Sequence, residues 1–443
     1  MHNRCVDHPF YKINKCFKDV KFYIYNEFMN TSEYLNSTIE YVKNTPLSLR
    51  HKNGQYPTPF SIVTELLNIV RDIGINFDEI ESILEPSAGT GQFMHKLLKR
   101  TRRNENRRIV AMDNDINSIN ILKEQFSKME NVKIINDDFL THKFKRKYKL
   151  IIGNPPYFET ILTKEQKEEF SDVIYGRTNI YTLFIKKCID LLDDNGVLAF
   201  VLPMSMLSGK YFEKLRNYII RYCNIKKIVL KSTNNFEEVQ QQIILLVLKK
   251  RYSDKVSEKY IVERQDGKIL FSTHYKQLNK LINNTKTIES LDCIVETGKF
   301  VRNQNKDLIL EKQTKKQKRI RLIWSHNVNN DELNNDKKKN KGIYVKKTDE
   351  TKQIAITAPF IVCKRIVNKS ASCFENVLIT EEEYGSTEFI CENHVNVIRG
   401  DIKNLEIIHK SLLNNKTMEF IEKIIGNTQV SQNELENLIP IFK

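Results

Sequence analysis

The 443-residue sequence lacks the features of a membrane-spanning, secreted or zinc-stabilised protein. No apolar run approaches the roughly 20 residues that a bilayer-spanning helix needs. The first residues contain neither an apolar signal region nor a small-residue cleavage site. The eight cysteines are scattered and form no CxxC pair, which argues against a zinc ribbon and a disulfide framework. We therefore expect a cytoplasmic protein with reduced thiols and no metal site, associated with the nucleoid if the host is a bacterium.

Positive charge is in excess. Lys and Arg number 71 against 55 Asp and Glu, which gives a net charge of +16 and a pI near 9.2. This balance suggests a polyanionic partner, with nucleic acid ahead of an anionic membrane. A lysine-rich composition from an AT-biased genome would give the same excess of positive charge. The net charge alone therefore does not indicate a function.

Alternating strand and helix patterns predict the fold of the first 250 residues. Helical periodicity at 61–70, 116–126 and 180–192 alternates with short apolar runs at 82–85, 107–113, 132–135, 149–153 and 196–202. Such alternation predicts right-handed βαβ units and a mostly parallel sheet, hence an α/β fold. In these sheets ligands bind beyond the carboxyl ends of the strands.

The pattern changes after about residue 290, where short β-like pieces precede two helical stretches at 404–424 and 431–438. We therefore predict three regions: an N-terminal extension over residues 1–50, a central α/β domain over 51–288, and a mixed α+β domain over 289–443.

A glycine motif follows the first predicted strand and precedes a helix, with the sequence Leu84-Glu85-Pro86-Ser87-Ala88-Gly89-Thr90-Gly91-Gln92-Phe93. Two glycines at such a turn let a ligand approach the backbone. Asp113 ends the next strand, where an acid can accept both hydroxyls of a ribose. Because the third glycine of GxGxxG is missing, the arrangement favours a nucleoside cofactor over a dinucleotide. A tight turn without any ligand is the alternative.

A second motif, Asn154-Pro155-Pro156-Tyr157, follows the fourth predicted strand. Two prolines fix a rigid, extended corner. The Asn154 side-chain oxygen and the Pro155 carbonyl can both accept hydrogen bonds from one exocyclic amino group. Tyr157 offers a flat face for a planar base. The corner thus suits an amide or amino nitrogen that must act as a nucleophile.

Together the motifs resemble the gamma-class N6-adenine DNA methyltransferases, the TaqI-type enzymes with the Asn-Pro-Pro-Tyr tetrapeptide. The resemblance covers roughly residues 50–250. It implies a Rossmann-like, S-adenosylmethionine-dependent methyltransferase sheet, a C-terminal target-recognition domain, and methylation of a flipped adenine in double-stranded DNA. The spacing between Gly91 and Asn154 leaves no room for an inserted recognition domain, so recognition is expected after residue 289.

The resemblance also assigns roles to individual residues. Catalysis falls to Asn154, Pro155, Pro156 and Tyr157, and Phe236 stands where the family has a second aromatic beside the flipped base. Cofactor binding falls to Tyr56, Thr58, Glu85, Pro86, Ser87, Gly89, Gly91, Phe93, Asp113, Asn114, Asp138 and Phe139. The sequence departs from the family at Asn114 and Asp115, which replace an apolar residue and an acid. Basic residues of the C-terminal domain are candidate DNA contacts: Arg302, Lys306, Lys316, Arg319 and Arg321.

Three readings of function remain. The first is the modification enzyme of a restriction–modification system, acting as a monomer with any cognate endonuclease on a separate chain. The second is an RNA-base or protein-glutamine methyltransferase with the same corner, although those families usually lack a large C-terminal domain. The third is a non-catalytic DNA-binding protein with a degenerate core, against which the intact motifs argue.

Overall fold

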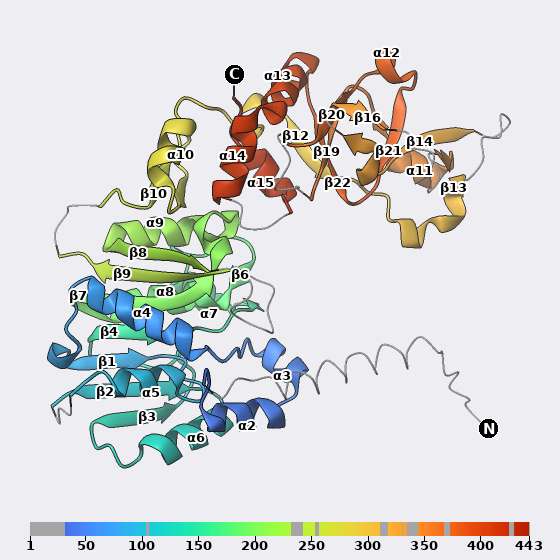
Figure 1. Cartoon of the computed structure of the whole chain (residues 1–443). Helices are drawn as coiled ribbons and strands as arrows, with labels where there is room; N and C mark the ends of the chain where they lie inside the picture. Colours follow the sequence, from blue (N-terminus) through green and yellow to red (C-terminus); the bar gives the residue numbers. More distant parts are fainter. Residues whose placement is uncertain are drawn as a thin grey trace, which may run out of the picture. The chain divides into compact units, whose positions relative to one another are not determined.

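The computed structural model describes two compact units (Figure 1). The described residues are 32–102, 106–231, 242–252, 257–310, 318–329, 331–334, 344–366, 373–424 and 429–442. The first unit comprises the described residues up to Met206 together with those of Lys214–Lys259, and the second comprises Leu207–Glu213 and those from Tyr260 onward.

The first unit is built on a seven-stranded sheet with the strand order β3-β2-β1-β4-β7-β9-β8. Neighbouring strands from β3 to β7 run parallel, whereas β9 runs antiparallel to both β7 and β8. The strands are β1 (Ser82–Glu85), β2 (Arg108–Asp113), β3 (Val132–Asn136), β4 (Tyr148–Gly153), β7 (Leu192–Pro203), β8 (Cys223–Lys231) and β9 (Ile243–Lys250). The arrangement confirms the predicted Rossmann-like α/β fold.

Apolar residues at helical spacing fix the helices to the sheet. Ile62, Val63, Leu66 and Val70 lie on one side of α4 and are 2% exposed or less. They share a core with apolar residues of α5, α6 and alternate positions of the central strands, as the 3.6-residue helical and two-residue strand periods require. The helices of this unit include α4 (Phe60–Asp72), α5 (Gln92–Leu98), α6 (Ile116–Phe126), α7 (Lys164–Glu169), α8 (Ile180–Leu191) and α9 (Glu213–Tyr222).

The described part of the N-terminal region belongs to this unit and is not a separate extension. Helix α2 (Asn36–Asn44) buries Ile39 and Val42 against Ile121 of α6, and the short α3 (Leu47–Lys52) follows. The Leu35 N–H donates to Gln92 Oε1 at 3.0 Å. Residues 1–31 lie outside the described part of the chain.

The second unit is a mixed α+β domain, as predicted. It contains a four-stranded sheet, β12-β22-β19-β20, and a five-stranded sheet, β13-β17-β14-β21-β18. The strands of these sheets are β12 (Ile294–Thr297), β13 (Ile309–Leu310), β14 (Arg319–Ile323), β17 (Tyr344–Lys346), β18 (Ile356–Thr357), β19 (Phe360–Lys364), β20 (Asn376–Ile379), β21 (Glu388–Cys391) and β22 (Val395–Arg399). Helices include α11 (Asp349–Gln353), α12 (Glu381–Tyr384), α13 (Ile402–Leu413), α14 (Asn415–Ile424) and α15 (Gln432–Asn437).

Two predicted boundaries differ from the structure. The units divide at Tyr260, not at residue 289, because the β10 (Ile261–Glu263) and β11 (Ile269–Phe271) pair and α10 (Tyr275–Leu281) bury apolar residues in the core of the second unit. The predicted helix 404–424 is two helices, because Asn414 leaves the helical conformation with ψ 136°.

Three further observations concern the described residues alone. No helix among them has both the length and the apolar character needed to cross a membrane. No group of three or more His, Cys, Asp and Glu side chains among them is arranged to hold a metal ion. Five of the cysteines that they include are buried: Cys188, Cys223, Cys293, Cys363 and Cys391.

Candidate cofactor pocket and catalytic corner

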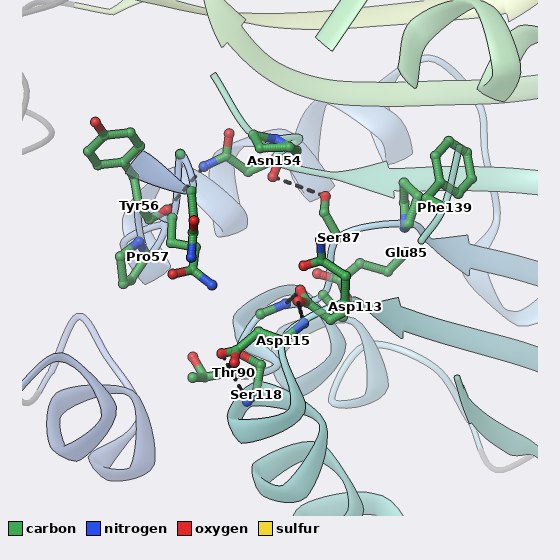
Figure 2. A pocket seen from close by; sticks show the side chains of 18 of the residues that line it. Tyr56, Pro57, Glu85, Ser87, Thr90, Asp113, Asp115, Ser118, Phe139 and Asn154 are labelled. Atoms are coloured by element: carbon green, nitrogen blue, oxygen red, sulfur yellow. Dashed lines mark hydrogen bonds between the residues drawn. The ribbon is translucent and has the colours of Figure 1, made fainter. Parts of the chain in front are cut away.

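A cavity of about 450 Å³ lies beyond the carboxyl ends of the parallel strands in the first unit (Figure 2). Because β1 pairs in parallel with both β2 and β4, the segments that follow these strands meet at one edge of the sheet. The volume of the cavity falls within the roughly 300–1,000 Å³ typical of small-molecule sites. The predicted residues that line it are Tyr56, Thr58, Glu85, Pro86, Ser87, Gly89, Phe93, Asp113, Asn114, Asp138, Phe139, Asn154 and Pro156.

The two glycines of the motif have different surroundings. Gly89 has φ +51°, and a Cβ atom added there would meet no atom within 4 Å, so its backbone is open to a ligand. Gly91 has φ +92°, and a Cβ there would lie 3.0 Å from Leu122 and Phe126. Gly91 is therefore required for the packing of α5 on α6, and it does not line the cavity.

Asp113 stands at the end of β2 with capacity to accept further hydrogen bonds. Its Oδ2 accepts from the Gly89 N–H at 2.8 Å, and its Oδ1 accepts from the Asp115 N–H at 2.9 Å. A carboxylate has about four lone-pair sites, and the backbone N–H of Asn114 also contributes a hydrogen bond, so capacity for a ligand hydroxyl remains. Burial raises the pKa of Asp113, although backbone hydrogen bonds from Asp115, Gly89 and Asn114 oppose the shift.

Glu85, at the end of β1, is the most deeply buried acid of the cavity wall. It is 1% exposed, and its Oε2 has no hydrogen-bond partner among the described residues. Burial first, and then the nearby charge of Asp113, raise the pKa of Glu85 well above its ordinary value. Burying a carboxyl oxygen without a hydrogen-bond partner costs free energy. A cationic ligand group in the cavity would provide that partner.

The segment after β3 forms another wall. Phe139 is buried against Phe184 of α8, with ring centroids 4.8 Å apart. Lys187, also on α8, donates to the carbonyls of Leu140 at 2.6 Å and His142 at 2.8 Å. Helix α8 thus fixes the backbone on which Asp138 and Phe139 are presented to the cavity.

The Asn-Pro-Pro-Tyr corner is held from two sides. The Asn154 Nδ2 donates to the Tyr56 carbonyl at 3.2 Å and to Thr58 Oγ1 at 3.0 Å. Ser87 Oγ donates to the Asn154 carbonyl at 3.1 Å, as Figure 2 shows. The Tyr157 hydroxyl contacts both Asn154 Oδ1 and the Val201 carbonyl. Pro155 is buried, and neither it nor Tyr157 lines the cavity.

Sequence reasoning missed one side of the cavity. Tyr41 of α2 lines it, and the Tyr41 hydroxyl donates to Asp115 Oδ2 at 2.8 Å. Burial raises the pKa of Tyr41, and its hydrogen bond to Asp115 adds to the shift. No motif marks Tyr41, because its place depends on the packing of α2 against α6. The other lining residues outside the prediction are Asn53, Gly54, Gln55, Pro57, Ala88, Thr90, Gln92, Asp115, Ile116, Ser118, Asp137, Phe158, Ile180 and Phe184.

The candidate DNA contacts that the structure describes lie in the second unit. Arg302 and Lys306 are exposed on short 3-10 turns. Arg319 and Arg321 alternate with buried residues along β14, and the Arg319 guanidinium lies 4.1 Å from the centroid of the Tyr344 ring. Lys316 and the second predicted base-stacking residue, Phe236, lie outside the described ranges.

Comparison with known proteins agrees with this geometry. Residues 19–236, which contain both motifs, match the family model of the Eco57I restriction-modification methylase. The chain is 28% identical over 408 residues to the type II methyltransferase M.CvrRI of Paramecium bursaria Chlorella virus XZ-6E, covering 92% of this chain and 98% of that protein. It is 26% identical over 418 residues to the modification methylase CviBIII of Paramecium bursaria Chlorella virus NC1A, covering 94% of this chain and 100% of the relative.

Solved structures also resemble the chain, among them one that extends over most of it. It is the type IIG restriction endonuclease BpuSI, with 12% identity and a TM-score of 0.45, covering 92% of this chain and 61% of the other. The chain is thus related to restriction-modification methylases in the segment with the two motifs, and to two viral methylases along nearly its whole length.

Proposed function

We propose that the protein is a DNA methyltransferase that transfers a methyl group to the N6 atom of adenine in duplex DNA, as the modification enzyme of a restriction–modification system. The observation that carries the proposal is the Asn154 corner directly beside a cavity suited to a nucleoside. The full-length similarity to M.CvrRI and CviBIII supports DNA as the substrate.

The cavity fits S-adenosylmethionine, which supplies a methyl group already activated on its sulfonium. Asp113 would accept from the ribose hydroxyls. The unpartnered carboxyl oxygen of Glu85 suits a cationic ligand group, and the open backbone at Gly89 leaves room for close approach. Asp138 and Phe139 would hold the cofactor's adenine.

The corner supplies acceptors for the amino group of the target base. Asn154 Oδ1 and the Pro155 carbonyl would accept from N6, which favours a pyramidal nitrogen with its lone pair free for in-line attack. These preorganised acceptors stabilise the developing charge without reorganisation. A base in a duplex is out of reach, so the adenine must flip out, and the Tyr157 ring would stack on it.

The second unit would then read the target sequence. Its candidate contacts are Arg302, Lys306, Arg319 and Arg321 in the described part, together with Lys316. We expect the protein to act as a monomer, and a cognate endonuclease, if the system has one, to be a separate chain.

The decisive experiment combines the protein with deuterated-methyl S-adenosylmethionine and methylation-free genomic DNA. Mass spectrometry of the digested DNA should find the label in N6-methyldeoxyadenosine. The Asn154→Ala variant should lose the label, whereas Asn120→Ala, an exposed site on α6, should keep it. Cofactor binding without label in DNA would contradict the proposal and direct the search to RNA or protein substrates.

A further inference from the structure

The side-chain amide of Asn154 must present its oxygen, and not its nitrogen, to a target amino group, because only the oxygen can accept a hydrogen bond. Both acceptors of its Nδ2 group come from one segment, residues 53–58. They are the Tyr56 carbonyl at 3.2 Å and the Thr58 hydroxyl at 3.0 Å. With the nitrogen held on that side, Oδ1 lies on the other side of the amide, where the Tyr157 hydroxyl contacts it. An amide oxygen has two lone pairs, so Oδ1 keeps one for a target amino group.

The same segment is tightly fitted against the corner. Gly54 has φ +63°, and a Cβ added there would lie 2.8 Å from the Tyr157 nitrogen and 3.1 Å from Pro156 Cβ. Thr58 is 4% exposed, and its carbonyl accepts from Gln92 Nε2 at 3.0 Å. The backbone that carries the Thr58 side chain is therefore held by Gln92, at the start of α5.

We propose that Thr58 is a positioning residue for methyl transfer: its hydroxyl, together with the Tyr56 carbonyl, holds the Asn154 Nδ2 toward residues 53–58, so that Oδ1 is the amide atom left to accept from the target amino group. The inference rests on the proposed function and adds a second role to a residue that the sequence assigned to cofactor binding. The two roles are compatible, because a hydroxyl that accepts from Asn154 keeps its own proton for a ligand in the cavity.

The test separates positioning from cofactor binding. Single-turnover rates are measured at saturating S-adenosylmethionine and DNA, and cofactor affinity is measured separately by calorimetry. Thr58→Val should lower the saturated rate about tenfold, the effect of losing one ordinary hydrogen bond. Thr58→Ser, which keeps the hydroxyl, should restore it to within about twofold of the wild-type rate. Thr64→Val, on α4 and away from the cavity, should leave both quantities unchanged.

A second measurement does not depend on activity. The side-chain amide signal of Asn154 in ¹⁵N-asparagine-labelled protein can be assigned by its loss in Asn154→Ala. It should shift and exchange faster with solvent in Thr58→Val than in Thr64→Val. A Thr58→Val variant with a wild-type rate at saturation, or with an unchanged Asn154 signal, would overturn the inference. A wild-type protein that transfers no methyl group to DNA while the signal responds as expected would instead overturn the proposed function.

Discussion

Tyr157 brings a ring and a hydroxyl to the Asn-Pro-Pro-Tyr corner, and the two parts make different contacts. The hydroxyl contacts Asn154 Oδ1 and the Val201 carbonyl, and its single proton can serve only one of these acceptors at a time. The ring lies edge-on to Tyr181, with centroids 6.0 Å apart. In the proposed reaction only the ring face meets the target base.

Tyr157→Phe should therefore keep a single-turnover rate within about threefold of wild type. Tyr157→Ala should lower the single-turnover rate about 10- to 100-fold, because stacking of a base on an aromatic ring contributes about 1–3 kcal/mol. Rapid-quench measurements with labelled cofactor would give both rates. Equal losses in the two variants would mean that the hydroxyl itself takes part in the reaction.

Glu85 gives a prediction about pH, since its pKa in the folded protein is raised well above the ordinary value. Above about pH 4.3 the unfolded chain releases this proton, whereas the folded protein retains it up to its higher pKa. The unfolded state then binds fewer protons, so the Glu85 contribution to the free energy of unfolding falls as pH rises through this window.

The neutral isostere in Glu85→Gln removes this dependence. Relative to wild type, the variant should gain stability as the pH is raised above about 4.3, until the pH passes the raised pKa of Glu85 in the folded protein. Urea unfolding without cofactor at several pH values would measure the difference. A difference that stays constant across this range would mean that Glu85 is ionised throughout in the folded protein.

At the scale of single residues, the motifs predicted much of the cavity wall, and the remaining wall residues depend on how the helices pack. Glu85, Gly89, Asp113 and Asn154 follow parallel strands, so adjacency of the strands brings them together. Gly91 belongs to the same motif, yet it lacks a side chain because Leu122 and Phe126 of α6 occupy the space that a Cβ atom would need. Local spacing cannot distinguish a glycine that admits a ligand from one that admits a neighbouring helix.

At the scale of elements, periodicity located the strands of the first unit well because their apolar runs are continuous and flanked by helices. The boundary between the units was missed because β10 and β11 have three residues each, too few to establish a period. The break between α13 and α14 was missed because both helices carry an apolar face, and a single residue, Asn414, separates them.

Helix α8 offers a test of how an element shapes the cavity. Lys187 bonds two carbonyls of the loop after β3, and its ammonium lies 5.4 Å from the Phe139 ring centroid. Lys187→Met should release the loop and raise the KM for S-adenosylmethionine about tenfold, since hydrogen bonds from charged groups contribute about 1.5–3 kcal/mol. The rate at saturating cofactor should change little.

Lys186→Met on the same helix is the matched control for this experiment. Lys186 pairs with Asp190 at 2.8 Å and does not line the cavity, so its loss should leave the KM for the cofactor unchanged. Steady-state kinetics with varied cofactor would compare the two variants. A fall in the saturated rate of Lys187→Met with an unchanged KM would contradict the assigned role of α8.

On the scale of the whole molecule, the proposed function needs both units and an anionic substrate. The net charge of +16 favours association with DNA through phosphate contacts. In the second unit, Arg319 and Arg321 lie on the same face of β14, because side chains alternate between the two faces of a strand and positions i and i+2 share a face. Ile320 and Leu322, on the opposite face, are buried.

This arrangement predicts a salt dependence. The logarithm of the binding constant for duplex DNA should fall linearly with the logarithm of salt concentration, by about 0.9 for each phosphate contact. If Arg319 and Arg321 each contact a phosphate, the double alanine variant should reduce the slope by about 2 and weaken binding to all sequences similarly. Arg71→Ala, which removes an exposed arginine paired with Asp72 in the first unit, should leave the slope unchanged.

Fluorescence anisotropy on target and scrambled duplexes would measure these binding constants and their salt dependence. An unchanged slope in the double variant would exclude both arginines as phosphate contacts, whereas a loss confined to the target duplex would assign them to base recognition, because guanine edges also accept from arginine.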